Sequence, residues 1–149
     1  MGSVVVMKSM WHSCWARLSV IAGFGLLVRL AFVLGITRFD EPVGDQLYYS
    51  AQALTNARGE WFEQPFAQGM PAADHPPLTS FLLTPVTWLT EASGSFVTAQ
   101  RLTMTLIGVT SIVIMAMIGR LLAGDRVGTI AAVITAVYAN VWVNDGLVM

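Results

Sequence analysis

A carboxylate and an imidazole stand side by side at Asp74 and His75, directly before Pro76 and Pro77. Proline is tolerated in the first turn of a helix, so a helix is expected to begin there. A helix start offers free N–H groups and a dipole that favours anions, and the two side chains could bind a divalent metal or a phosphate. The alternative is structural, a solvated loop tip or a helix cap.

A second candidate is Asp45, which follows a glycine at the start of an expected helix over residues 46–57. Asp45, Tyr48, Tyr49 and Gln52 are spaced by three, four and seven positions, so they share one face of that helix. The alternative for Asp45 is an N-cap that accepts a bond from a backbone N–H, worth about 1 kcal/mol.

The composition predicts the setting of these residues. Of 149 residues, 55% are hydrophobic and 11% are charged, whereas soluble domains carry about 25% charged residues. Eight basic and nine acidic residues nearly cancel, so no basic field exists to bind nucleic acid. Cys14 is the single cysteine, which excludes an intramolecular disulfide and a cysteine-based zinc ribbon. We therefore expect an all-α membrane protein.

Apolar stretches long enough to cross a bilayer predict three transmembrane helices joined by one long loop and one turn. The expected segments are a tail at 1–17, spans at 18–36, 96–122 and 127–143, a loop at 37–95 with helices near 46–57 and 76–90, a turn at 123–126 and an end at 144–149. An alternative counts residues 75–89 as a fourth span. Only about a dozen apolar-rich residues lie there and Pro85 interrupts them, which favours a helix at the membrane surface.

The charges predict the orientation. Residues 37–95 contain seven acids and two bases, whereas the remainder contains six bases and two acids. Lys8 and Arg17 precede the first span, and Arg120 and Arg126 flank the turn, which places the N-terminus in the cytoplasm. The long loop then lies outside. We expect a multi-pass protein of the plasma (inner) membrane, in contact with its lipids.

Two charged residues are unusual for membrane spans. Arg29 lies about 10 Å below the outer end of the first span, where it must snorkel or find a partner. Asp145, at the outer end of the third span, also needs hydration or a partner. Arg101, one turn into the second span, could face an anionic lipid head group or mark the interface.

Three motifs follow one another in the outer loop. They are Gly44-Asp45-Gln46-Leu47-Tyr48-Tyr49, then Gly59-Glu60-Trp61-Phe62-Glu63-Gln64-Pro65, then Asp74-His75-Pro76-Pro77-Leu78. With the span before them, they resemble the start of the GT-C superfamily of membrane glycosyltransferases. The branch is that of protein O-mannosyltransferases and bacterial aminoarabinose transferases, of the glycosyltransferase family 39 type. The resemblance covers residues 17–149.

The resemblance implies transfer of a sugar from a polyprenyl-phosphate donor to an acceptor on the outer face of the membrane. It implies that Asp45 is catalytic, as a general base or as the organiser of a metal at the donor phosphate. Other roles that it implies are substrate or phosphate binding by His75, Tyr48, Tyr49 and Arg101, metal binding by Asp74, and a possible second acid at Asp145. The aminoarabinose transferases have Glu-Lys where this chain has Asp74-His75, and many members have Asp-Glu where it has Gly44-Asp45.

Members of this superfamily have many more spans, so we expect the chain to be an N-terminal fragment that has no activity alone. The alternative from another class is a non-catalytic membrane protein that binds lipid or a partner subunit. A transporter subunit is disfavoured, because the acids gather in the loop and the spans carry few polar groups at mid-depth.

Overall fold

The computed structural model describes residues 2–67 and 69–149, with side chains from Cys14 onward, so the side chain of Lys8 lies outside the description. Within these ranges the chain is helical and has no strand. The helices are α1 (Gly2–Gly35), η1 (Thr37–Phe39), α2 (Asp45–Ala57), α3 (Leu78–Thr90), η2 (Glu91–Ser93), α4 (Phe96–Ala123), α5 (Asp125–Val137) and α6 (Ala139–Asp145). The helical class expected from the composition is confirmed.

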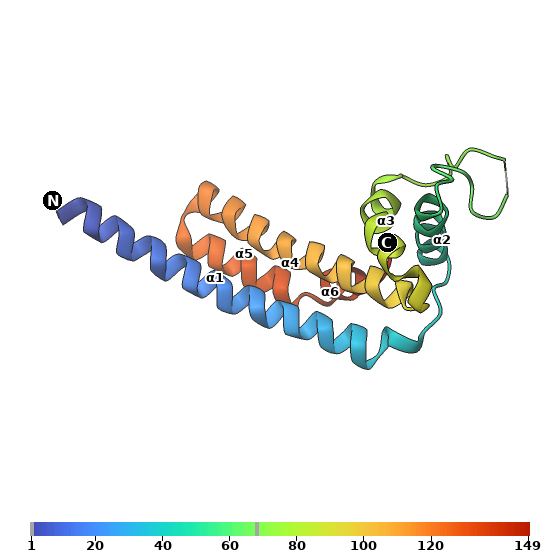
Figure 1. The fold of residues 1–149 in the computed structure, drawn as a ribbon. Coiled ribbons are helices and arrows are strands. Elements are labelled where there is room, and N and C mark those ends of the chain that lie inside the picture. Colours follow the sequence, from blue (N-terminus) through green and yellow to red (C-terminus); the bar gives the residue numbers. More distant parts are fainter. Residues whose placement is uncertain (1, 68) are drawn as a thin grey trace.

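Helices α1, α4 and α5 run side by side as a bundle, while α2 and α3 lie across one end of it (Figure 1). Small residues let α4 and α5 approach closely. A Cβ on Gly128 would lie 2.6 Å from the carbonyl oxygen of Ala116, and one on Gly119 would lie 3.1 Å from the Cα of Gly128. Close backbone contact of this kind is typical of helices that pack inside membranes.

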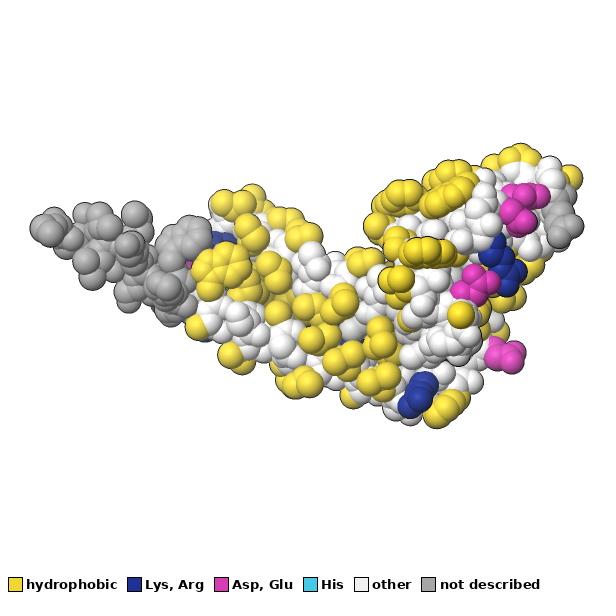
Figure 2. Space-filling model, in the orientation of Figure 1, with side chains coloured by type: hydrophobic (Ala, Val, Ile, Leu, Met, Phe, Trp, Pro, Cys, Tyr) yellow, Lys and Arg dark blue, Asp and Glu magenta, His cyan; other side chains and the backbone are white. Residues whose placement is uncertain are grey.

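Two helices are long and apolar enough to cross a membrane, residues Cys14–Gly35 and Phe96–Ala123. A third crossing is formed if α5 and α6, which meet at an angle of 60°, count as one span. The expected continuous helix over 127–143 is therefore broken. On the face seen in Figure 2, most charged side chains lie at the end that carries α2 and α3, and the bundle is largely apolar.

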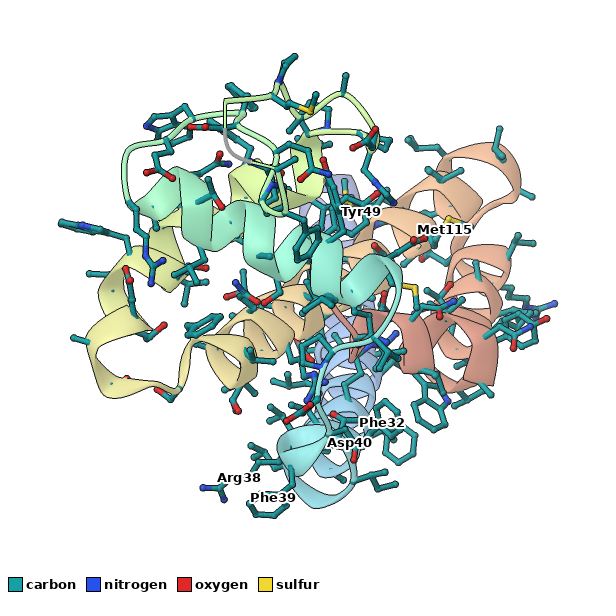
Figure 3. All side chains as sticks on the ribbon, turned by 90° about the vertical axis from the view of Figure 1, so that its right-hand side faces the viewer. Phe32, Arg38, Phe39, Asp40, Tyr49 and Met115 are labelled. Carbon is teal, nitrogen blue, oxygen red and sulfur yellow. The ribbon has the colours of Figure 1, made fainter. Side chains whose placement is uncertain are left out.

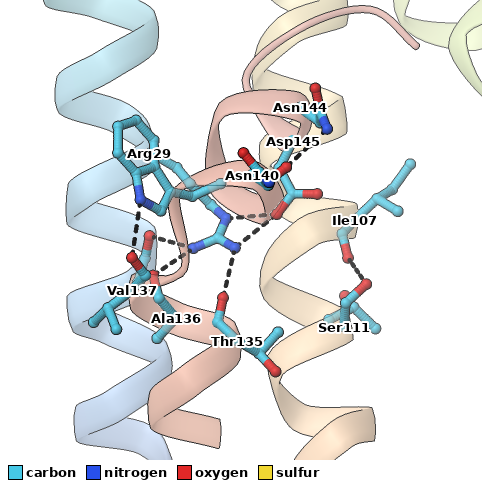
Figure 4. Close-up of polar contacts among 12 residues, drawn as sticks. Arg29, Ile107, Ser111, Thr135, Ala136, Val137, Asn140, Asn144 and Asp145 are labelled. Carbon is cyan, nitrogen blue, oxygen red and sulfur yellow. Dashed lines mark hydrogen bonds and ion pairs between the residues drawn. The ribbon is translucent and has the colours of Figure 1, made fainter.

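The break between α5 and α6 lies at Tyr138, whose backbone is extended (φ −69°, ψ 115°). Ending α5 there leaves its last carbonyl oxygens without helical partners. Arg29 on α1 donates to the carbonyl oxygens of residues 135–136 at 3.4 Å, and the Trp142 indole donates to that of Val137 at 3.2 Å (Figure 4). Because an unsatisfied carbonyl in lipid costs several kcal/mol, these side chains stabilise the break.

We call α2, α3 and the loop between them the head. A small apolar core, formed by Ala53, Leu83 and Val148, joins the head to the last residues of the chain. Polar contacts complete it: Asn56 donates to the hydroxyl of Thr84 at 3.3 Å. The chain thus returns from the bundle after α6 and packs between the two head helices.

Helix α3 turns its polar side inward. Its buried residues include Ser80, Thr84 and Thr87, which pack against α2 and α4. Its exposed side is apolar, with Leu78 65%, Trp88 67% and Leu89 72% exposed. On this side the ring of Phe81 contacts Trp61, with centroids 6.2 Å apart, whereas Leu78, Trp88 and Leu89 stay exposed.

Candidate functional site

Asp45 is the first residue of α2, and its side chain does not cap the helix. Gly44 is the N-cap, with no side-chain cap bond, and its carbonyl oxygen accepts from the N–H groups of Leu47 and Tyr48. The Asp45 carboxylate is 72% exposed, and its Oδ1 lies 3.2 Å from Nε2 of His75. Asp45 is thus not the N-cap of α2, which was the structural alternative, and its carboxylate is accessible to solvent.

His75 is held by aromatic rings of α2. Its ring stacks on Tyr48, with centroids 4.0 Å apart and planes at 26°. Tyr49 meets it edge-on at 5.4 Å. The helical face predicted from the sequence therefore brings Asp45, Tyr48 and Tyr49 around a single imidazole.

The phenol of Tyr48 has a raised pKa. Burial raises the pKa of its phenol above the ordinary value of 10.0, and the negative charge of Asp74 and the neighbouring phenol of Tyr49 raise it further. The hydroxyl therefore keeps its proton at neutral pH, so it can donate as well as accept a hydrogen bond.

Asp74 lies beside this group, but its side chain turns toward the loop. Its Oδ2 accepts from Nε2 of Gln64 at 3.3 Å. Asp45 and His75 contact each other, and the described residues contain no group of three or more His, Cys, Asp or Glu side chains placed to hold a metal ion. These side chains do not by themselves fit a divalent metal, and metal binding by Asp74 stays a prediction.

Arg101 is placed apart from the acid and histidine. Its side chain is buried, and it donates to the carbonyl oxygen of Thr37 and, at 3.0 Å, to that of Asp40. Figure 3 shows Asp40 in the connection between α1 and α2. Arg101 thus fastens this connection to α4, and phosphate binding by Arg101 stays a prediction.

Asp145, the possible second acid, is paired with Arg29. Its Oδ2 accepts from Nε at 2.9 Å and from Nη2 at 2.6 Å (Figure 4). The fit is close on the α4 side as well, because a Cβ on Gly108 would collide with the Asp145 carboxyl group. Each of these two residues was expected to need a partner, and each provides it for the other. Within the described part of the chain, the hydrogen bonds of this pair do not include Asp45.

Two buried polar contacts of the head, one of them with α4, have no counterpart in the sequence interpretation. Gln100 donates to the hydroxyl of Thr87 at 2.8 Å, and Gln52 donates to Oδ1 of Asn56 at 3.1 Å. The signal that could have found them is the polar stripe of α3 opposite its apolar one, which requires a polar neighbour.

Comparison with known proteins adds no relative. No family model matches the chain, and neither a curated protein nor a solved structure matches it.

Proposed function

We propose that the chain is the N-terminal part of a membrane glycosyltransferase that takes its sugar from a polyprenyl-phosphate donor on the outer face of the membrane. The observation that carries the proposal is the accessible Asp45 carboxylate, 3.2 Å from an imidazole that two tyrosines hold. The resemblance of the loop motifs to the GT-C superfamily supports the same function.

The proposed topology has three spans, with the N-terminus in the cytoplasm and the head outside. Arg120 and Arg126 flank the α4–α5 turn, at the opposite end of the bundle from the head (Figure 1). Positive residues favour the cytoplasmic side, and the head would then face outward. In a plasma membrane, that places Asp45 where lipid-linked sugars and their acceptors could meet it.

Helix α3 is proposed to lie at the outer membrane surface. Its 13 residues span about 20 Å, too short for a hydrocarbon core of about 30 Å. Its exposed apolar side, with Trp88, suits the interface, where tryptophan is enriched. The head would then rest on the membrane beside the lipid part of the donor.

The chemistry needs a base. As the acceptor oxygen bonds to the anomeric carbon, the bond from that carbon to the phosphate oxygen breaks, and the polyprenyl phosphate leaves with the electron pair. The acceptor's hydroxyl proton passes to Asp45. His75, contacting Oδ1, orients the carboxylate and leaves Oδ2 to take the proton.

The test uses the protein encoded by the complete reading frame, in membranes given a radiolabelled polyprenyl-phosphate sugar. We expect transfer of label to an acceptor, and loss of that transfer in Asp45→Asn. Glu41→Gln is the matched control, because Glu41 is another exposed acid of the same loop. Absence of transfer from every polyprenyl-phosphate sugar tested would reject the proposal, whereas equal transfer by both variants would reject the catalytic role of Asp45.

A non-catalytic lipid-binding protein is the second candidate, favoured by the exposed apolar side of α3. It predicts that the Asp45→Asn variant binds vesicles like the wild type and that neither protein transfers sugar.

A further inference from the structure

Three buried polar atoms without a hydrogen-bond partner among the described residues belong to one narrow crevice of the head. They are the Tyr48 hydroxyl oxygen, Gln52 Oε1 and His75 Nδ1. Their three residues line the crevice together with Phe62 and Ser80. An unpaired buried polar group costs about 1–3 kcal/mol, so three around one space indicate an absent polar partner.

The chemistry of the three atoms defines that partner. Nε2 of Gln52 donates to Asn56, which leaves Oε1 as an acceptor. In the neutral tautomer of His75 whose Nε2–H donates to Asp45 Oδ1, Nδ1 is also an acceptor. The Tyr48 hydroxyl can act either way. The ligand group must therefore donate a hydrogen bond to one of the two acceptors. A ligand hydroxyl can do so and can also accept a hydrogen bond from Tyr48.

Phe62 forms one wall of the crevice and has a strained main chain. Phe62 has φ of 59°, a left-handed conformation that costs a non-glycine residue about 1–3 kcal/mol. Two hydrogen bonds hold its main chain: its N–H donates to Asn56 Oδ1 at 3.0 Å, and its carbonyl oxygen accepts from the N–H of Ala72 at 2.7 Å. The crevice has no room for a free water molecule, so a ligand group can enter only if a wall residue moves.

We propose that the Tyr48–Gln52–His75 crevice binds a hydroxyl group of a sugar beside Asp45. This inference rests on the proposed function, and it adds the recognition element: the hydroxyl donates to Gln52 Oε1 or His75 Nδ1 and accepts from Tyr48. The apolar ring faces of Tyr48 and Phe62 would contact the C–H faces of the sugar.

The test is nitrogen NMR of the imidazoles, because the chain has only two histidines, His12 and His75. The 149-residue chain in lipid nanodiscs is titrated with D-mannose, D-glucose and L-arabinose in turn, and with ethylene glycol as a hydroxyl compound that is not a sugar. We expect a saturable shift of His75 Nδ1 with at least one sugar and none for His12. No shift up to the solubility limit, or an equal response to ethylene glycol, would overturn the inference.

Tyr48→Phe separates binding from folding. It deletes a hydroxyl that has no partner in the described structure, so a purely structural role predicts unchanged or higher stability. We expect sugar affinity to fall by about threefold or more, while Tyr138→Phe, a control on the exposed break, leaves it unchanged. Equal affinity in both variants would reject the assignment.

Failure of the inference and failure of the proposed function give different results. Saturable sugar binding together with full transfer by Asp45→Asn would reject the catalytic role of Asp45 and support sugar binding by the crevice. Transfer that depends on Asp45, with no response of His75 to any sugar, would support the proposed enzyme and reject sugar binding by the crevice.

Discussion

The pairing of Arg29 with Asp145 leads to a quantitative prediction about stability. Arg29 is fully buried, Asp145 is 20% exposed, and the guanidinium also donates to the carbonyl oxygen of Gly25 at 3.1 Å. Removing one partner of a buried ion pair costs about 3–5 kcal/mol, because the other charge stays buried without compensation. Since Asp145 keeps some exposure, we expect Arg29→Met to lower the free energy of unfolding by about 3 kcal/mol.

The assay is reversible unfolding in mixed micelles, arranged as a double-mutant cycle. The double variant Arg29→Met with Asp145→Leu should cost less than the two single changes added together, because it leaves no lone charge. The matched control is the pair of Arg58 and Glu91, at 2.8 Å but 58% and 32% exposed; Arg58→Met should cost at most about 1 kcal/mol. If Arg29→Met costs no more than Arg58→Met, or if the cycle is additive, the reasoning is refuted.

Three further predictions concern pH, packing and the membrane. The unfolded Tyr48 phenol loses its proton near 10.0, before the folded one does. The free energy of unfolding should therefore fall as pH rises above that value, an effect that Tyr48→Phe reduces and that pH-dependent unfolding would detect. Gly128→Ala forces α4 and α5 apart and should cost about 1–3 kcal/mol, whereas Gly23→Ala, with no atom within 4 Å of its Cβ, should be neutral or stabilising, as parallel unfolding curves would show. In a variant that retains only Trp88, fluorescence should be quenched by lipids brominated on the acyl chain, and unquenched emission would place α3 away from the membrane.

The ranges of α2, α3 and α4 were predictable from the sequence because apolar stretches, glycines and prolines mark them, whereas the helical conformation of residues 2–17 was not predicted. The apolar stripe of α3 and the shared face of Asp45, Tyr48 and Tyr49 follow from helical periodicity. These local patterns were enough to predict that Asp45, Tyr48 and Tyr49 lie on one face of a helix. The stacking of His75 on Tyr48 joins two segments that are separated by the loop. Periodicity within one helix does not predict such a contact.

The break at Tyr138 was not predictable, because neither proline nor glycine stands at that position. It depends on Arg29, more than a hundred residues away in the chain, which satisfies the freed carbonyl oxygens. For the same reason Arg29 and Asp145 were each expected to need a partner but were not paired with each other. Long-range pairs inside a bundle depend on helix packing, which a single sequence does not define.

The most direct test of catalysis by Asp45 is a steady-state measurement of kcat and KM for a polyprenyl-phosphate sugar, with the wild type and Asp45→Asn compared in the same membranes. Loss of a general base lowers the rate by about 10²–10⁴-fold, so we predict a fall in kcat of that size with little change in the KM for the donor. A kcat for Asp45→Asn within a few-fold of the wild-type value would contradict the assignment of Asp45 as the base.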